Sequence, residues 1–138
     1  MAQPDPPGAR PRLSLDLLPD TLAICRLDGT AALPSWAAGS SPFLTVSRTA
    51  DELSITTIQA SVPADARCER GYRAFRVRGP LPLTLVGILA SMAEPLAQAG
   101  LSIFAISTYD TDYVLVKGRD LDEAIRALTH AGHRISRS

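Results

Sequence analysis

The side chains of this sequence best suited to binding an ion or a ligand are aspartates in a short polar turn. Asp110 and Asp112 lie in the segment Tyr109–Asp112, and Asp120 and Asp122 follow within the next ten residues. Carboxylates at this density suggest Ca²⁺, but the pattern lacks the loop glycine and the terminal Glu of an EF-hand. An Asp in a turn also bonds its own backbone. We therefore expect no metal, and we interpret Asp110 as a residue that shapes the turn.

The two histidines, His130 and His133, have the spacing His-x-x-His. Gly132 stands between them and should end a helix there. Two ligands without a third or fourth make a poor zinc site, so we interpret the pair as a solvated helix end. The sequence also contains no Ser-His-Asp order, P-loop or Gly-x-Gly-x-x-Gly motif. We predict that the protein is not an enzyme, has no catalytic residues and needs no cofactor.

Cys25 and Cys68 are the two cysteines, and they form no Cys-x-x-Cys motif. Cys25 lies inside the apolar run Leu22–Leu27, where a free cysteine behaves as a small hydrophobic residue. Two cysteines in a chain of 138 residues do not make a disulfide scaffold. We expect two free thiols and a cytoplasmic location.

The charge balance gives no general attraction to nucleic acid or to an anionic membrane, because 14 basic residues match 14 acidic ones. The basic residues include a local cluster of arginines: Arg67, Arg70, Arg73, Arg76 and Arg78. We interpret this cluster as a solvated face, with a nucleic-acid stripe as the alternative. No apolar run approaches the ~20 residues of a membrane helix. We expect neither nucleic acid nor membrane as a partner.

The C-terminal half shows the hydrophobic periodicity of alternating strands and helices. The expected elements are a strand at Tyr72–Arg78, a helix at Leu83–Ala99, strands at Leu101–Thr108 and Tyr113–Lys117, a helix between Asp120 and Gly132, and a strand at His133–Ile135. This β-α-β-β-α-β order predicts an α+β fold of the ferredoxin-like type, with both helices on one face of an antiparallel sheet.

Two details of the expected helices can be checked. Gly87 lies inside the first helix, where Ala would be better by about 1 kcal/mol, so we expect a close neighbour there. Asp120 and Glu123 have the spacing of a capping box at the start of the second helix.

The preceding part of the chain predicts a shortened second unit. Residues 1–12 are rich in proline, which indicates a disordered tail. Strands are expected at Leu13–Leu18, Leu22–Leu27, Phe43–Arg48 and Leu53–Ile58. We therefore divide the chain into a tail at 1–12, a shortened unit at 13–70 and a full unit at 71–138. The strand Leu101–Thr108 is apolar on both faces, so its second face should be covered by the N-terminal half or by another subunit. We expect a homodimer or a higher homo-oligomer.

Several segments together resemble the CASTOR-type ACT domain family. They are Phe43, Ser47–Thr49, Asp51–Ile55, Gly87–Ala90, Glu94–Ala97 and Ala99–Val116. The stretch Ile106–Asp112, Ile-Ser-Thr-Tyr-Asp-Thr-Asp, is the most specific part of the likeness. The resemblance implies a pair of ACT units, with a small ligand, typically an amino acid, at the interface between units. In the arginine-sensing members, the ligand pocket is lined by the positions that match Ser54, Ile55, Thr108, Tyr109 and Asp112.

The chemistry of these positions is compatible with an amino acid. Asp112 can accept a charge-assisted bond from the ammonium group, and carbonyls of Thr108 and Tyr109 can add acceptors. The helix N-terminus after Gly79–Pro82 favours a carboxylate. The stretch Leu81–Leu85 has no acidic residue, which disfavours arginine and favours an apolar or small polar side chain.

Three functions from different classes remain as interpretations of the sequence. The first is a non-catalytic regulatory protein of the ACT type that binds an amino acid. The second is an ACT-like scaffold that pairs with itself or with a partner and binds no ligand. The third is an enzyme, which would need two strongly coupled titratable groups in a cleft, and the sequence offers no such pair.

Overall fold

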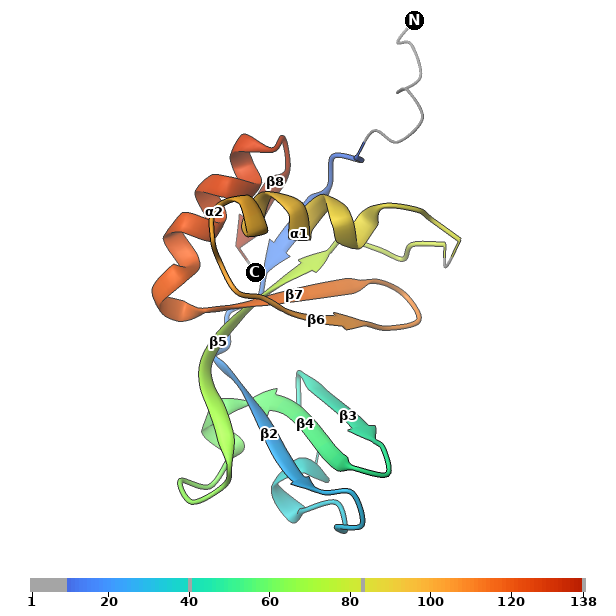
Figure 1. Ribbon diagram of the computed structural model, residues 1–138, viewed down its shortest axis with the longest axis vertical. Coiled ribbons are helices and arrows are strands. Elements are labelled where there is room, and N and C mark those ends of the chain that lie inside the picture. Colours follow the sequence, from blue (N-terminus) through green and yellow to red (C-terminus); the bar gives the residue numbers. More distant parts are fainter. Residues whose placement is uncertain (1–9, 40, 83, 138) are drawn as a thin grey trace, which may run out of the picture. The chain divides into compact units, whose positions relative to one another are not determined.

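The computed structural model describes residues 10–39, 41–82 and 84–137 and divides into two compact units (Figure 1). One unit is formed by the described residues of Met1–Leu18 and Ala74–Ser138, and the other by Pro19–Arg73. The first is called the helical unit, because it contains α1 and α2, and the second is called the strand unit. Strand β5 (Cys68–Val77) begins in the strand unit and ends in the helical unit.

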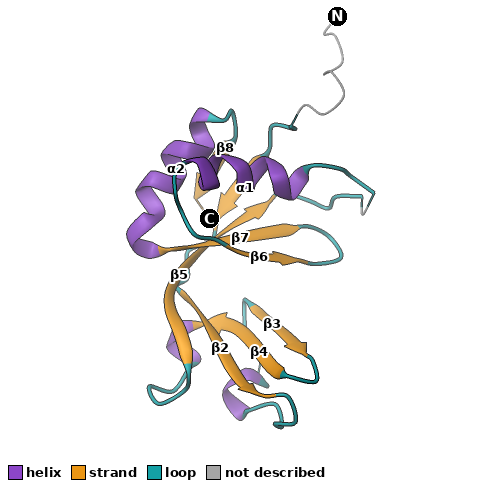
Figure 2. Ribbon diagram, in the orientation of Figure 1, coloured by secondary structure: helices purple, strands orange, loops and turns teal. Residues whose placement is uncertain are grey.

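The helical unit has the predicted β-α-β-β-α-β order. After β5 come α1 (Ile88–Gln98), β6 (Phe104–Ser107), β7 (Asp112–Lys117), α2 (Leu121–His130) and β8 (Arg134–Arg137). The strand β1 (Ser14–Leu17) joins this unit, antiparallel to β5 and parallel to β8. The sheet order is therefore β6-β7-β5-β1-β8. Figure 2 shows both helices on the same side of this sheet, which confirms the ferredoxin-like α+β prediction.

The core of the helical unit follows from the period-two alternation of its strands. Alternate strand residues and the inner stripes of both helices form one buried apolar cluster, which includes Leu15, Leu17, Phe75, Val77, Met92, Leu96, Val114, Val116, Ala124 and Leu128. Because β1 supplies part of this cluster, residues before the strand unit complete the sheet that follows it in the chain.

Helix α1 begins at Ile88, several residues later than the periodicity predicts. Pro80 and Pro82 have no N–H group to donate, and Gly87 has a φ of 83°, so the preceding segment is a loop. Leu83, the expected first residue of the helix, lies outside the described residues. The nearest atom to a Cβ built at Gly87 is Pro11 Cδ at 3.7 Å, an ordinary contact. The prediction of a close neighbour at a helical Gly87 is wrong. A glycine is favoured here because the backbone has a positive φ, which other residues rarely adopt.

The predicted capping box of α2 is also wrong. Asp120 stands at the N-cap of α2, but its side chain makes no capping hydrogen bond. It ends a short 3-10 helix (Gly118–Asp120), and its φ and ψ of −98° and 1° differ from the extended conformation that a capping side chain uses. The buried residues of α2, Ala124 and Leu128, are four positions apart and lie on one face of the helix.

The strand unit is a four-stranded antiparallel arrangement in the order β3-β4-β2-β5. Its remaining strands are β2 (Leu22–Asp28), β3 (Leu44–Arg48) and β4 (Glu52–Ile58). Short 3-10 helices at Ser35–Ala37 and Gln59–Ser61 lie in the connections between β2 and β3 and between β4 and β5. The strands expected at Leu22–Leu27, Phe43–Arg48 and Leu53–Ile58 are therefore confirmed in this unit, whereas the strand expected at Leu13–Leu18 is β1 of the helical unit.

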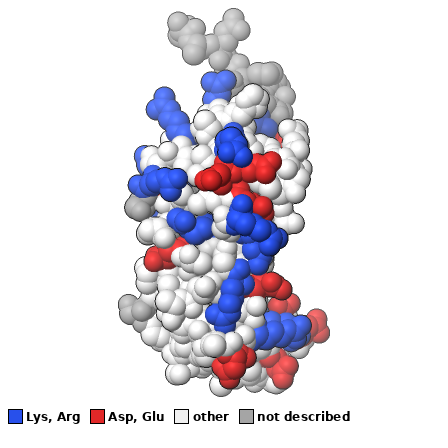
Figure 3. Space-filling view, turned by 90° about the vertical axis from the view of Figure 1, so that its left-hand side faces the viewer, with Lys and Arg blue, Asp and Glu red and all other residues white. Residues whose placement is uncertain are grey.

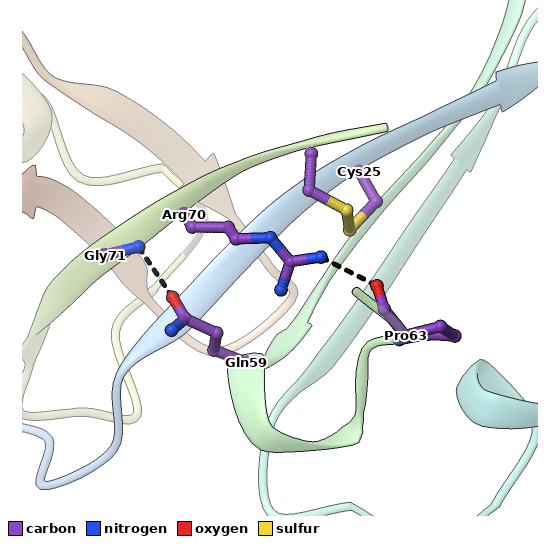
Figure 4. Close-up of a disulfide and its surroundings, with 6 residues drawn as sticks. Cys25, Gln59, Pro63, Arg70 and Gly71 are labelled. Atoms are coloured by element: carbon purple, nitrogen blue, oxygen red, sulfur yellow. Dashed lines mark hydrogen bonds between the residues drawn. A yellow bond between two sulfur atoms is a disulfide. The ribbon is translucent and has the colours of Figure 1, made fainter. Parts of the chain in front are cut away.

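Cys25 and Cys68 form a disulfide, so the prediction of two free thiols is wrong. The two residues face each other in the antiparallel β2–β5 register, with their Cα atoms 4.0 Å apart. They are 43 residues apart in the sequence, and only strand pairing brings them together. Figure 4 shows the bond beside two further contacts of β5, from Gly71 N–H to Gln59 Oε1 (2.7 Å) and from Arg70 Nη2 to the Pro63 carbonyl (2.7 Å).

Candidate functional site

A hollow of about 200 Å³ lies in the helical unit, between the β6–β7 turn and the loop that leads into α1. Its lining comes from two segments, Leu81, Pro82, Leu85 and Ile88 on one wall and the turn residues Ser107, Thr108, Tyr109, Asp110, Thr111 and Asp112 on the other. The hollow is smaller than the roughly 300–1,000 Å³ of pockets that hold drug-sized ligands.

Hydrogen bonds within the β6–β7 turn fix the polar wall. Thr108 N–H donates to the Thr111 carbonyl at 2.8 Å, which closes the turn. Ser107 faces Asp112 in the strand register, and its hydroxyl donates to Asp112 Oδ1 at 2.6 Å. The turn thus holds one carboxylate in a defined position on the wall of the hollow.

The two walls are fastened to each other and to the sheet. Leu81 N–H donates to the Asp110 carbonyl at 2.7 Å, which ties the loop to the turn. The Thr111 hydroxyl donates to the Val77 carbonyl of β5. Because β5 is part of the core, these bonds hold the turn and the loop in fixed positions relative to the sheet.

The N-terminus of α1 reaches the hollow through Ile88, the first residue of the helix. The N-cap residue is Gly87, and no side chain caps the first turn. The N–H groups of a first helical turn have no partners within the helix, and together with the helix dipole they favour a negative charge. The hollow therefore has a carboxylate on one wall and an uncapped helix N-terminus on the other.

Three of the five residues taken from the family resemblance line this hollow together: Thr108, Tyr109 and Asp112. Tyr109 is 81% exposed, so its ring stands at the mouth. Ser54 and Ile55 lie on β4 in the strand unit. Ile55 is fully buried and packs with Leu53 in the core of that unit, whereas Ser54 is half-buried.

The sequence reasoning missed Ser107 as a partner of Asp112. The signal was present, because a hairpin that closes at Thr108–Thr111 places residues 107 and 112 opposite each other. The apolar wall was missed for a different reason. Leu85 and Ile88 have helical spacing, which is typical of a helix core as much as of a pocket wall.

Two members of the arginine cluster, Arg76 and Arg78, are partly exposed and share one acidic partner on the sheet. Arg76 Nη2 and Arg78 Nη2 bind the two oxygens of Asp16, at 3.0 and 2.6 Å, and the Asp16 side chain is only 7% exposed. Hydrogen bonds from Arg78 and from Arg76 hold the pKa of the Asp16 carboxyl below its usual value, although burial acts in the opposite direction. On the face drawn in Figure 3, positive and negative side chains are interspersed. The two arginines thus neutralise a buried carboxylate on the sheet.

His133 is buried, so its interpretation as part of a solvated helix end is wrong. Leu13 N–H donates to His133 Nδ1 at 3.0 Å. The acceptor role of Nδ1 places the proton of the neutral ring on Nε2, which lies 2.8 Å from the Ser91 carbonyl of α1. The imidazole therefore fastens the residue before β1 to α1.

Residues 10–12, which the sequence assigned to a disordered tail, are described in the structure and make specific contacts. Arg10 Nε lies 3.1 Å from Glu94 Oε2, and the Pro11 carbonyl accepts a hydrogen bond from the Ser91 hydroxyl. Residues 1–9 lie outside the described part of the chain.

Within the described residues, no group of three or more His, Cys, Asp or Glu side chains is arranged to hold a metal ion. In the same part of the chain, no helix has the length and apolar character needed to cross a membrane.

Comparisons with known proteins agree with the fold. A family model described as ACT domain matches residues 67–130, and a second model, described as an N-terminal domain, matches residues 20–65. Part of the chain is 45% identical, over 40 residues, to the human protein CASTOR3P. That match covers 29% of this chain and 24% of CASTOR3P, so the alignment spans about a quarter of that protein.

Solved structures match over nearly the whole chain. A crystal structure of a protein from Agobacterium tumefaciens is 37% identical, with a TM-score of 0.86, and the match covers 93% of this chain and 95% of that one. The regulatory subunit of aspartate kinase from Thermus thermophilus, in its ligand-free form, is 16% identical with a TM-score of 0.54. That match covers 90% of this chain and 99% of the subunit, and at this identity it shows a common fold.

Proposed function

Because this chain belongs to the ACT-domain family, we propose that it is a non-catalytic regulatory protein that binds a free amino acid in the hollow of the helical unit. The observation that carries the proposal is the pairing of opposite electrostatic features across one small hollow. Asp112 lies on one wall, and the uncapped N-terminus of α1, at Ile88, lies on the other. An α-amino acid carries an ammonium and a carboxylate on the same carbon and matches both.

The binding mode follows from charge. The ammonium group would donate to Asp112, whose Oδ1 already accepts from Ser107 and is therefore held in place. The carboxylate would accept from the first N–H groups of α1, where the helix dipole adds to the hydrogen bonds. Thr108 and Tyr109 would contribute backbone and ring contacts from the turn.

Ser54 and Ile55 are further contributors that the family resemblance proposes. Both lie on β4 of the strand unit and neither is among the residues that line the hollow, so the resemblance alone carries them. Their part is tested by Ser54→Ala, which should weaken ligand binding without lowering the melting temperature.

The regulatory role is supported by the fold shared with the aspartate kinase regulatory subunit from Thermus thermophilus. A regulatory domain acts when ligand binding changes its contacts with itself or with a partner. We propose that this protein acts as a homodimer or a higher homo-oligomer. The disulfide removes the ground on which a cytoplasmic location was expected, because disulfides are rare in cytosolic proteins.

A thermal-shift screen of the full chain against the twenty amino acids tests the proposal. A ligand at 100 times its Kd stabilises the folded state by about 2.7 kcal/mol, which is readily seen as a higher melting temperature. Stabilisation by one amino acid or a small group of them is expected. If none of the twenty shifts the melting temperature at millimolar concentration, the amino-acid proposal fails.

A scaffold that pairs through this region without a ligand is the second candidate. The favouring observation is the exposure of large apolar side chains beside the hollow, with Val86 at 87% and Tyr109 at 81%. Isolated exposed apolar residues are common, but a local group of them marks contact surfaces. A negative screen combined with a dimer that dissociates on Val86→Asp would favour this candidate.

A further inference from the structure

The apolar wall of the hollow is the feature that the general amino-acid proposal leaves unused. Leu81, Pro82, Leu85 and Ile88 form this wall, and none of these side chains offers a hydrogen-bonding group. Ile88 is 7% exposed and belongs to the core, whereas Leu85 is 49% exposed. The wall thus runs from the packed interior out to the mouth.

The exposed part of Leu85 is apolar surface in contact with water beside a concave site. Covering such surface is favourable, because it removes apolar area from water. A ligand anchored by Asp112 and the start of α1 would place its side chain along this wall, because the polar wall is occupied by its ammonium group. An apolar ligand side chain is the one most stabilised there, because its contact with the wall removes water from its own surface and from that of Leu85.

A charged ligand side chain would lack a partner on the apolar wall. A guanidinium or an ammonium taken from water needs carboxylates or several carbonyls. The remaining carboxylate of the lining is Asp110, and it lies on the turn, the same wall as Asp112. Asp110 is exposed, so solvent screens its charge, and its backbone carbonyl already accepts from Leu81 N–H.

We propose that the ligand is an α-amino acid with an uncharged, apolar side chain of the size of valine, leucine, isoleucine or methionine. This inference rests on the proposed function and narrows it to one class of ligand. Leu85 is the residue that selects the side chain, because it combines contact with the hollow and exposure to an incoming ligand.

Isothermal titration calorimetry on the full chain gives the first test. Leucine, isoleucine, valine and methionine are compared with arginine, lysine, aspartate and glutamate at the same pH and ionic strength. The best apolar ligand should bind at least about tenfold more tightly than any charged one, since each ~1.4 kcal/mol changes affinity tenfold.

Substitution of Leu85 gives the second test. Leu85→Ala should weaken binding of the best apolar ligand about tenfold, and Leu85→Asp should weaken it further while improving the binding of lysine or arginine. Both variants should fold, because Leu85 is half exposed and its backbone bond to Pro82 is kept. Leu33→Asp is the matched control, since Leu33 is 42% exposed and lies in the strand unit.

The outcomes separate the two proposals. If charged amino acids bind best, or if Leu85→Ala leaves every affinity unchanged, the apolar class is wrong while amino-acid binding stands. If no amino acid binds the parent protein, the proposed function itself fails.

Discussion

Asp112 illustrates how one side chain can have both a structural partner and a proposed ligand. Its Oδ1 accepts from the Ser107 hydroxyl across the β6–β7 pair, and its backbone continues the strand register. An amide could keep this hydrogen bond, because Asn retains an acceptor oxygen. The negative charge is therefore the property that distinguishes a ligand-binding role from a role in the turn.

We predict that Asp112→Asn keeps the melting temperature of the unliganded protein but loses most of the ligand-induced shift. Loss of a charge-assisted bond costs roughly 1.5–3 kcal/mol, or about ten- to a hundredfold in affinity. Thermal melts and calorimetry with the best-binding amino acid measure the two effects. Asp110→Asn is the control from the same turn and should keep its affinity. A large drop in unliganded stability, or an unchanged affinity, would place the ammonium elsewhere.

Asp16 makes the free energy of unfolding depend on pH in the acidic range. The lowered pKa means that the folded state prefers the ionised carboxylate more than the unfolded chain does. Its stabilising contribution is thus complete above the ordinary value of 3.8 and is lost as the pH falls from there through the lowered folded value. Urea unfolding from pH 6 to pH 2 should show parent and Asp16→Asn differing most at pH 6 and converging in acid. A constant difference across this range would contradict the assignment.

At the scale of the elements, the sequence predicted the order of strands and helices correctly but placed one helix start wrongly. Burial of one face leaves a pattern in the sequence, so the strand that contains Phe75 and Val77 and the helix that contains Ala124 and Leu128 could be predicted from it. Leu85 continues the apolar periodicity of α1 in the sequence, but it lies in the loop before the helix and lines the hollow. The position of β1 in the sheet could not be predicted from the sequence, because β1 pairs with β5 and β8, which are far from it in the chain.

Gly87 gives the test of the corrected helix start. With a φ of 83°, an alanine there should destabilise the protein by about 1–2 kcal/mol through backbone strain. Gly39→Ala is the matched control, since Gly39 has no positive φ and, apart from its chain neighbours, no atom of the described residues lies within 4 Å of the place that a Cβ would take. That control should be neutral or slightly stabilising. Denaturant unfolding of both variants measures the difference, and a neutral Gly87→Ala would count against the loop assignment.

The Cys25–Cys68 bond gives a prediction for the strand unit. Cross-links of this kind stabilise by roughly 2–4 kcal/mol, mainly by restricting the unfolded chain. A reductant should therefore lower the unfolding free energy of the parent by about that amount and leave the Cys25→Ala/Cys68→Ala double variant unaffected. Trp36, the single tryptophan, packs against the buried cluster of Ala23, Cys25 and Val62. Its fluorescence therefore reports the unfolding of the strand unit. Thiol titration of the denatured, unreduced protein should find no free thiol, and two would contradict the disulfide.

At the scale of the whole molecule, the family resemblance supplied what local patterns could not. Thr108, Tyr109 and Asp112 line one hollow and were found through the Ile106–Asp112 stretch. The apolar wall and the Ser107 contact needed coordinates, because they depend on where α1 begins and on the strand register. Composition alone indicated only a neutral globular protein, which fits many functions.

Self-association is the prediction that belongs to this scale. In the helical unit, β6 is an edge strand that pairs only with β7 among the described strands. Phe104 and Ile106 of β6 are apolar and only partly buried, so this edge keeps both unpaired backbone groups and apolar surface. A second copy could satisfy both. We expect a homodimer or a higher homo-oligomer at micromolar concentration, measured by light scattering coupled to size exclusion.

Ile106→Lys should shift this equilibrium toward the monomer while leaving the fold intact, because a charge on an edge strand opposes pairing between copies. Val46→Lys is the matched control, since Val46 is an exposed apolar residue, at 43%, on β3 of the strand unit. Circular dichroism establishes that both variants are folded. A parent protein that is monomeric at micromolar concentration would exclude self-association as part of the regulatory mechanism. An oligomer unaffected by Ile106→Lys would instead move the interface away from β6.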